Sequence, residues 1–439
     1  MYSVVTRVWL LLLTCIMMGN ARIYAQSLSQ HFDRYSFLDS NQNYIGNHQR
    51  GMKHFYRQLA KMESGQIRTI NVVHIGDSHI QADWFSGEVR RLLQQRFGSA
   101  GRGLVFPYSL AKTNSPGDIH SYSNVSWQVD RVISRDNHLP IGLSGITMRT
   151  YRPDFSLKVS VDDAKGLDYS FNKVTVFTGD DQDHFDLLAS TTPLGPQARS
   201  KDVVQTNSQM RVKGVAGSEE LFPITLAARS INPFTSTIYL PELTHHIYLQ
   251  AWPDLDYQKQ ATIYGLVLEN FNASGILYHT IGVNSAQYRH YAKADIFAEQ
   301  LQALRPDLVV ISLGTNESVG YFSEGRFFSQ VDDLVHDIEK YLPHAAIIFT
   351  TPPDAFYQGK VNANVNQCRN VLLDYAFDND LSCWDLYEIM GGTGSVDRWH
   401  YSGLAGRDRL HFTKSGYELQ GKLLFDAIMK GYDAYLTSK

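Results

Sequence analysis

The sequence of 439 residues has no run of basic residues interleaved with aromatic ones. Lysine and arginine together number 40 against 44 acidic residues, which gives a net charge of −4. Because binding of nucleic acid needs a concentrated positive surface, this balance argues against that function. There is also no internal repeat or low-complexity tract, and 43% of the residues are hydrophobic, as in ordinary globular proteins. The length favours two domains.

A hydrophobic run long enough to span a membrane is missing near the N-terminus. The apolar run from Val8 to Met18 is shorter than the ~20 residues that a span needs. Arg7 precedes it and Ile23-Tyr24-Ala25 follows, which is typical of a cleaved secretion signal over residues 1–25. We therefore expect a protein exported to the periplasm or beyond, without a stable membrane span. Removal of the signal takes away two arginines, leaving 38 basic against 44 acidic residues and a net charge of −6.

Cysteine is scarce, with only three in the chain. Cys15 falls within the predicted signal, so Cys368 and Cys383 remain in a compartment where disulfides persist. They are either bridged or two buried thiols, and the sequence leaves both alternatives open.

Apolar periodicity predicts an α/β fold in two pieces. A strand at 70–75 and an amphipathic helix at 82–97 come first, and the same alternation resumes after residue 275. Short apolar strands separated by helices indicate a doubly wound, mostly parallel, five-stranded sheet of flavodoxin-like type, covered on both faces. The later strands are expected at 276–281, 308–312, 346–350 and 382–385, and the later helices at 295–304, 327–342, 361–377 and 415–432.

The segment between these pieces has a different character. It alternates apolar and polar residues in short runs, with Gly, Pro, Asn and Asp between them, and shows no helical period. Because structureless loops beyond ~15 residues are uncommon, we expect an inserted all-β, jelly-roll-like domain. The predicted division is 26–112 and 271–439 for the α/β domain and 113–270 for the insert.

Polar turns follow the predicted strands. Ligands of open α/β sheets bind beyond the carboxyl ends of the strands, so these turns should converge on one edge. They are Gly76-Asp77-Ser78-His79, Gly282-Val283-Asn284, Gly314-Thr315-Asn316-Glu317 and, before the last helix, Asp408-Arg409-Leu410-His411.

The chemistry of these turns is complementary. A serine hydroxyl becomes a nucleophile when an imidazole oriented by a carboxylate takes its proton. Asp408 and His411 are three residues apart, so one turn can bring both to Ser78. The backbone N–H groups of Ser78 and Gly282 and the side-chain amide of Asn316 are candidate donors to the oxyanion of a tetrahedral intermediate.

Together these four turns resemble blocks I, II, III and V of the SGNH (GDSL-like) hydrolases. The resemblance implies Ser78 as nucleophile and oxyanion donor, with His411 as base and Asp408 as the acid that orients it. It also implies Gly282 and Asn316 as further oxyanion donors. Glu317 stands where this family usually has Asp, and the resemblance assigns it no role.

A narrower resemblance comes from the string Gly76 to Asp83, Gly-Asp-Ser-His-Ile-Gln-Ala-Asp, combined with the insert. It is similar to periplasmic peptidoglycan O-acetylesterases, in which a carbohydrate-binding-module-like domain interrupts the hydrolase domain. This implies an acetylated glycan as substrate, neither cofactor nor metal, and substrate contacts from His79 and Gln81. The oligomeric state is left open.

Three other functions remain as alternatives. One is an O-acetylesterase acting on a different polysaccharide. Another is a metal-dependent phosphoesterase, since the residues near the turns include metal-ligand types, and the third is a non-catalytic glycan-binding protein. The metal-ligand types are His79, Asp83, Asn316, Asp408 and His411, and the insert offers Trp127, Tyr169 and Trp252 either for stacking on sugars or for its own core.

Overall fold

The computed structural model describes residues 32–179, 183–192, 203–206, 209–213, 221–229, 235–252 and 255–438. The predicted signal segment, residues 1–25, lies outside the described residues. No helix in the described part of the chain is both long enough and apolar enough to cross a membrane.

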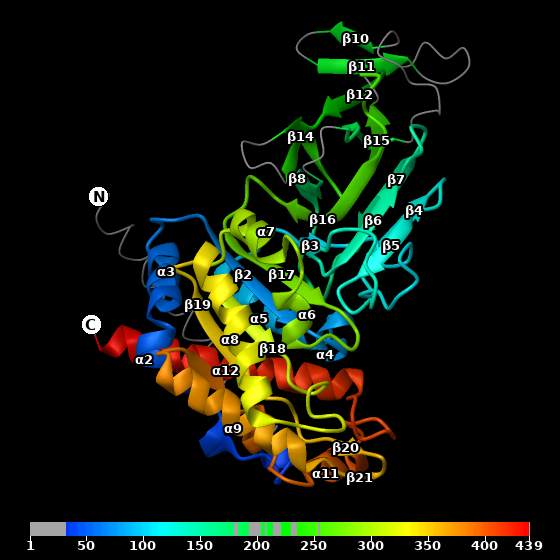
Figure 1. Cartoon of the computed structure of the whole chain (residues 1–439). Coiled ribbons are helices and arrows are strands. Elements are labelled where there is room, and N and C mark those ends of the chain that lie inside the picture. The colour runs from blue at the N-terminus through cyan, green and yellow to red at the C-terminus, as the bar shows by residue number, and fades with distance from the viewer. Residues whose placement is uncertain are drawn as a thin grey trace, which may run out of the picture.

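A central sheet of six strands organises the α/β part (Figure 1). Five of its strands are parallel and stand in the order β17-β2-β18-β19-β22, so the strand order reverses between β2 and β18. A sixth strand pairs antiparallel with β22 at the edge, which corrects the expected five-stranded sheet. That strand has two residues, too few for any periodicity to reveal. The strands are β1 (Ile45–Gly46), β2 (Thr69–Gly76), β17 (Gly275–Gly282), β18 (Leu308–Ser312), β19 (Ala346–Thr350) and β22 (Ser382–Trp384).

Helices cover both faces of this sheet. Successive residues of each strand point to opposite faces, and because both sets are apolar, both faces need to be covered. Val72 packs on one face with residues of α3, α5 and α12, whereas Val73 packs on the other with residues of α7, α8 and α9. The helices are α2 (His48–Gly51), α3 (Lys53–Glu63), α4 (Ser78–Gln81), α5 (Phe85–Phe97), α6 (Tyr288–Ala292), α7 (Phe297–Leu304), α8 (Glu324–Tyr341), α9 (Ala363–Asp378), α10 (Leu386–Ile389), α11 (Ser395–Tyr401) and α12 (Lys414–Thr437). Three minor elements are η1 (Ser40–Gln42), β20 (Phe356–Tyr357) and β21 (Lys360–Val361).

Between α5 and β17 every named element in the described residues is a strand. They form two antiparallel sheets, ordered β10-β11-β12-β9-β15-β7-β4 and β13-β14-β8-β16-β6-β5, with β3 also paired to β16. The first sheet contains β4 (Ile119–Ser123), β7 (Ser156–Val161), β9 (Asp186–Ser190), β10 (Val203–Thr206), β11 (Gln209–Lys213), β12 (Leu221–Leu226) and β15 (His246–Trp252). The second contains β3 (Gly103–Val105), β5 (Gln128–Arg131), β6 (Ile146–Thr150), β8 (Phe171–Thr178), β13 (Ala228–Arg229), β14 (Thr235–Thr244) and β16 (Ala261–Glu269).

This β region, residues 103–269, shares its hydrophobic core with the α/β part. One continuous cluster of buried side chains includes Leu249 and Leu266 from the two β sheets together with Ile75 and Leu301 from the α/β part. The region also takes in β3, which lies before residue 113 and pairs antiparallel with β16. Figure 1 shows the β region stacked on one side of the α/β layers. The two parts are therefore packed as neighbours rather than joined only by linkers.

The three aromatic residues singled out in the insert lie in its packing. Tyr169 and Trp252 are buried. Trp127 is half-buried, with its ring centroid 5.2 Å from that of Phe155 and its indole N–H donating to Ser123 Oγ. The exposed aromatic rings of this region belong to other residues, among them Tyr122 and Tyr151.

The two remaining cysteines are not bridged. Cys368 lies on α9 and Cys383 on β22, and both thiols are free and buried. Burial raises the pKa of each thiol well above its ordinary value. Of the two alternatives that the sequence leaves open, the structure shows the buried thiols.

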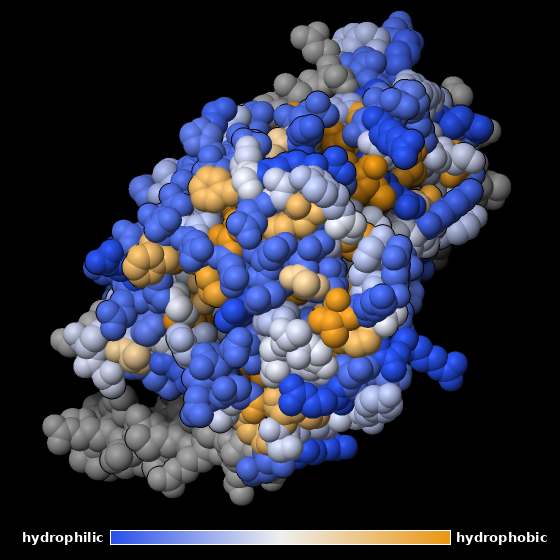
Figure 2. Space-filling model, turned by 60° about the horizontal axis from the view of Figure 1, so that its bottom comes forward, coloured by the Kyte–Doolittle hydropathy of each residue, from blue (hydrophilic) through white to orange (hydrophobic). Residues whose placement is uncertain are grey.

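The molecular face drawn in Figure 2 is mostly hydrophilic. Its apolar side chains form small separate groups among polar ones rather than one broad patch. Scattered apolar groups of this kind are normal on globular proteins.

A buried cluster of charges joins the two parts of the chain. Asp83, just after α4, forms ion pairs with Arg90 at 2.7 Å and with Arg102 at 2.6 Å. Arg102 also binds Asp118, and Arg90 Nε donates to the hydroxyl of Tyr169. Burial alone would raise the pKa of Asp118, but the guanidinium of Arg102 lowers it to about 2. Asp83 therefore acts as a counter-ion inside the fold.

Replacing this counter-ion should destabilise the fold strongly. Asp83→Ala leaves two buried guanidinium groups short of charge, and breaking a buried ion pair typically costs ~3–5 kcal/mol. The matched control is Asp154→Ala, which removes an exposed ion pair to Arg152 and should cost about 1 kcal/mol or less. Urea unfolding measures both free energies, and equal losses in the two variants would contradict this assignment.

Candidate active site

The first polar turn places Ser78 at the carboxyl end of β2, as the first residue of the short helix α4. Gly76 makes this turn possible, because a Cβ there would lie 2.2 Å from Ile80 Cγ1 and 2.9 Å from the carbonyl oxygen of Ser312. The carboxylate of Asp77 caps the helix by accepting a hydrogen bond from the N–H of His79 at 2.9 Å. The tight turn thus aims the start of the helix toward the sheet edge where strand order reverses.

Ser78, His411 and Asp408 form one chain of hydrogen bonds. Ser78 Oγ lies 3.1 Å from His411 Nε2, and His411 Nδ1 lies 2.8 Å from Asp408 Oδ2. With Nδ1–H donated to the carboxylate, Nε2 is left to accept the proton of the serine. This is the order of groups that activates a serine hydroxyl.

The turn before α12 holds Asp408 in place. Its second oxygen accepts hydrogen bonds from the N–H groups of Leu410 and His411 at 3.2 and 3.1 Å. Arg409 has a φ of 51°, and this left-handed residue closes the turn. Burial would raise the pKa of Asp408, but hydrogen bonds from the His411 side chain and these two amides lower it. The carboxylate is thus kept charged beside the imidazole, and about half of each side chain is open to solvent.

Asn316 lies next to this chain, in the turn after β18. Its Nδ2 donates to Asp77 Oδ2 at 2.9 Å and to the carbonyl oxygen of Ala286 at 3.0 Å. Burial raises the pKa of Asp77 to about 7. Both amide hydrogens of Asn316 therefore have partners in this state, and donation to an oxyanion would require that one of them be shared or turned.

Gly282 ends β17 beside Gly76 in the parallel register. A Cβ at Gly282 would lie 2.5 Å from the backbone nitrogen of Gln81, so glycine allows α4 to pack against this strand. The turn that follows contains Ser285, which is exposed and has a φ of 66°. Within the described residues the backbone N–H of Ser285 has no hydrogen-bond partner. It is therefore a further candidate donor to the oxyanion of the tetrahedral intermediate. The sequence gives no signal for it, because glycine is the usual mark of a left-handed residue.

His79 and Gln81, the two residues expected to touch substrate, are buried. His79 Nδ1 lies 2.9 Å from the hydroxyl of Tyr417, and its ring centroid is 5.5 Å from that of His411. Burial lowers the pKa of His79 to about 3, so the ring is neutral. It therefore packs beside His411 without adding charge.

Gln81 forms hydrogen bonds with two other segments of the chain. Its Nε2 donates to Thr113 Oγ1 at 2.7 Å and to the carbonyl oxygen of Asn114 at 2.9 Å. Its Oε1 accepts from the N–H of Asn284 at 2.6 Å. Gln81 thus links the nucleophile helix to the turn after β17 and to the segment between β3 and β4 in the β region. The reason for its burial lies in residues far away in sequence.

The metal-ligand types near the turns do not gather around one point. Asp83 is bound to two arginines and His79 to Tyr417. His74, inside β2, is also buried and lies within hydrogen-bond distance of Tyr278 and Ser312. Asp83, His79 and His74 thus each have partners within the protein.

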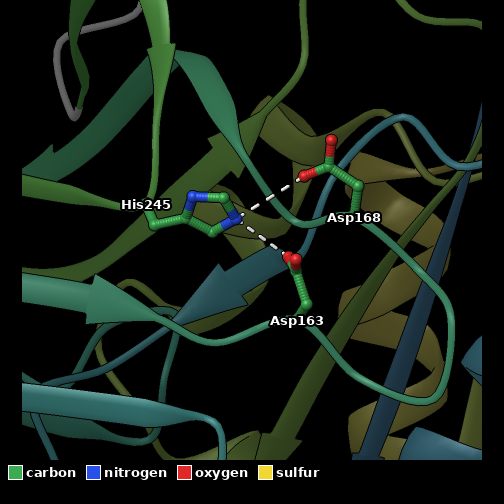
Figure 3. Close-up of side chains that lie close together, drawn as sticks. All are labelled: Asp163, Asp168 and His245. Atoms are coloured by element: carbon green, nitrogen blue, oxygen red, sulfur yellow. Dashed lines mark hydrogen bonds and ion pairs between the residues drawn. The ribbon is translucent and has the colours of Figure 1, made fainter.

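Among the described residues, one group has the spacing that a metal ion needs, and it lies in the β region (Figure 3). Asp163, Asp168 and His245 are exposed, and their ligand atoms lie within 4.8 Å of one another. His245 Nε2 is 2.8 Å from Asp163 and 3.6 Å from Asp168. These ion pairs already explain why the three side chains meet.

Comparisons with known proteins relate these features to a family. Residues 249–419 match the model of the GDSL-like Lipase/Acylhydrolase family. The match includes Gly282, Asn316, Asp408 and His411 but begins after Ser78, because the β region separates the first turn from the others. No curated protein sequence matches the chain.

Solved structures resemble the chain to different extents. A peptidoglycan O-acetylesterase is 21% identical, with a TM-score of 0.64 over 87% of this chain and 96% of its own. A lipase/acylhydrolase from Enterococcus faecalis is 20% identical over 36% of this chain and 77% of its own, with a TM-score of 0.29. A carbohydrate acetylesterase from Sinorhizobium meliloti is 16% identical over 35% and 79%, with a TM-score of 0.27. The α/β part of this chain therefore has the fold of the SGNH (GDSL-like) hydrolases, and the chain as a whole resembles a peptidoglycan O-acetylesterase in architecture.

Proposed function

We propose that this chain is an exported serine esterase that removes O-acetyl groups from a cell-envelope glycan, with peptidoglycan as the substrate. The observation that carries the esterase is the hydrogen-bonded chain Ser78–His411–Asp408 at the switch point of the sheet. The choice of glycan is supported by the architecture shared with a peptidoglycan O-acetylesterase. Export is proposed from the N-terminal signal pattern.

In the proposed reaction, His411 Nε2 takes the proton of Ser78 while Ser78 Oγ bonds to the carbonyl carbon of the acetyl ester. The C–O bond to the sugar then breaks, and His411 returns the proton to the departing sugar oxygen. Water, deprotonated by His411, next attacks the carbonyl carbon of the acetyl-serine. The bond from that carbon to Ser78 Oγ then breaks, His411 returns the proton to Ser78 Oγ, and acetate leaves. Asp408 keeps the imidazole in the required orientation throughout. Each step uses groups of this chain alone, so neither cofactor nor metal enters it.

The oxyanion formed in both halves of the reaction needs donors. We propose the N–H groups of Ser78 and Gly282 and the amide of Asn316 for this role. One such donor is typically worth ~3 kcal/mol of barrier. Turning the Asn316 amide toward the oxyanion would break its bond to Asp77 or to Ala286. Asp77, whose pKa is about 7, can accept that change by binding a proton.

The β region is proposed as an inserted, carbohydrate-binding-module-like domain that contacts the polymer. The chain enters it from α5 and leaves it through β16 directly into β17, whose end carries Gly282. At its entry, Thr113 and Asn114 bind Gln81 on the nucleophile helix. We therefore expect a glycan bound at Ser78 to contact the β region near Thr113 and Asn114.

Variants of the three central residues test the proposed chemistry. Ser78→Ala and His411→Ala should each lower acetate release from O-acetylated peptidoglycan by roughly 10⁶-fold, and the double variant should be little worse, because the residues act as a unit. Asp408→Asn should cost roughly 10⁴-fold, since the base survives but loses its orientation. Acetate is measured enzymatically, with circular dichroism confirming the fold of each variant.

Two controls separate this function from the alternatives. Acetate release should persist in EDTA, whereas its loss in EDTA would show that the ester hydrolysis needs a metal ion and would contradict the serine mechanism. Parallel assays on acetylated xylan compare another polysaccharide directly. No acetate from any acetylated glycan, or full turnover in Ser78→Ala, would overturn the proposal.

Exposed aromatic residues of the β region test its contact with substrate. Tyr122→Ala and Tyr151→Ala should lower acetate release from the polymer several-fold, because remote contacts raise catalytic efficiency only on substrates that reach them. Turnover of nitrophenyl acetate should stay unchanged. Phe377→Ala, an exposed aromatic on α9, is the matched control. Equal effects on polymer and small ester, or none on either, would refute the contact.

A further inference from the structure

A cavity of about 240 Å³ lies beside the turn that carries Asn316. Its walls come from the start of α6, from the turn after β18 and from the first turns of α8. The polar side chains among its lining residues include Gln287, Arg289, Glu317, Tyr321, Ser323 and Arg326. At this volume the cavity suits one small chemical group rather than a length of polymer.

The cavity is rich in positive charge. Within the described residues neither Arg289 nor Arg326 forms an ion pair with a carboxylate. Arg289 Nε donates to Gln287 Oε1 at 2.6 Å, and Arg326 Nη2 donates to the carbonyl oxygen of Tyr321 at 3.0 Å. Since a guanidinium carries five N–H donors, each keeps several for a ligand. The N-terminus of the 18-residue helix α8, capped by Ser323, adds its positive end.

Glu317 is the acidic residue of this lining, and it is buried with one oxygen unsatisfied. Its Oε1 accepts from the N–H of Tyr288 at 2.7 Å, whereas its Oε2 has no hydrogen-bond partner. Its side chain is only 8% exposed. Burial raises the pKa of Glu317 to about 8, so the group is mostly protonated at neutral pH and Oε2–H lacks an acceptor. A protonated Glu317 therefore adds no negative charge beside Arg289 and Arg326.

The cavity is connected to the catalytic turn by hydrogen bonds. Gln287 Nε2 donates to the carbonyl oxygen of Asn316 at 2.9 Å, and the same side chain accepts from Arg289. Asn316 in turn binds Asp77, the residue before Ser78. The cavity is therefore linked through Gln287 and Asn316 to the residue that precedes the nucleophile.

Resting on the proposed function, we propose that this cavity binds a carboxylate of the glycan substrate, held by the guanidinium groups of Arg289 and Arg326. Guanidinium groups bind carboxylates through charge-assisted, often bidentate hydrogen bonds. Two sources share this chemistry. One is peptidoglycan, through its peptide carboxylates or a lactyl carboxylate that carries no peptide, and the other is the uronic acids of other glycans. The enzyme would then select acidic acetylated glycans over neutral ones.

A binding experiment tests the cavity independently of catalysis. The full chain carrying Ser78→Ala, which leaves esters intact, is titrated by calorimetry with N-acetylmuramate, its methyl ester and galacturonate. N-acetylmuramate should bind at least ~10-fold more tightly than its methyl ester, as expected when charge-assisted bonds are lost. Arg289→Ala and Arg326→Ala should abolish this difference. Arg50→Ala, which removes an equal charge from α2, should retain it.

The outcomes of this titration separate the two sources. Binding of N-acetylmuramate alone assigns the cavity to peptidoglycan, and equal binding of galacturonate assigns it to acidic glycans in general. No binding of either acid, equal affinity for acid and methyl ester, or an unchanged preference in both arginine variants would overturn the inference.

A kinetic experiment distinguishes failure of this inference from failure of the proposed function. O-acetylated peptidoglycan is compared before and after amidation of its carboxylates. Amidation should lower kcat/KM of the unaltered chain ~10-fold, and Arg326→Ala should make the two substrates equivalent. Equal kcat/KM on both substrates, with normal turnover of nitrophenyl acetate, would sink the inference and leave the esterase standing. Absence of all ester hydrolysis would sink the esterase, while the titration still decides the cavity.

Discussion

The short buried turn that carries Ser78 is held between two carboxylates inside the protein, and the rest of the site depends on this. Asp77 binds the N–H of His79 and the amide of Asn316, while Asp83 binds Arg90 and Arg102. Burying a carboxylate costs free energy unless it is paired or protonated, so the fold must place hydrogen-bond or ion-pair partners beside each one. The turn after β18, helix α5 and the approach to β3 are thereby placed relative to the serine.

The same contacts attach the β region to the catalytic edge. Arg102 extends from Asp83 to Asp118, and Gln81 extends from α4 to Thr113 and Asn114. A long insertion therefore leaves the first turn in register with the others, although about 200 residues separate Ser78 from Gly282 in the sequence. The protein thus has two distinct features near Asn316: the triad at the edge of the sheet, and the cavity lined by Arg289 and Arg326. In the proposed account the first carries out the chemistry and the second selects the substrate.

Local pattern predicts much of this structure. The five parallel strands are apolar runs between helices, and each expected strand overlaps an observed one. Asp408 and His411 stand three residues apart in one turn, so their contact needs only local geometry. The strands β1 and β3 were missed, because two and three residues carry no periodicity and their pairing partners are distant.

The local sequence pattern also does not reveal which polar side chains are buried by residues that are distant in the sequence. His79 and Gln81 look like surface polar groups beside a nucleophile, but Tyr417 and Thr113 cover and bind them. Likewise, nothing local shows that Asp83 faces Arg102, or that Glu317 lies in a cavity with arginines from two other elements. These are tertiary contacts between residues far apart in the sequence, and they decide the roles of the polar side chains near the nucleophile.

The central claim is that Ser78 is a nucleophile activated by His411, and covalent labelling tests it most directly. The chain is treated with a fluorophosphonate, which phosphonylates activated serines, and the labelled peptide is identified by mass spectrometry. The account predicts one adduct, on Ser78, that is lost in Ser78→Ala and strongly slowed in His411→Ala. An unlabelled Ser78 in the folded chain, or labelling at the same rate in His411→Ala, would contradict it.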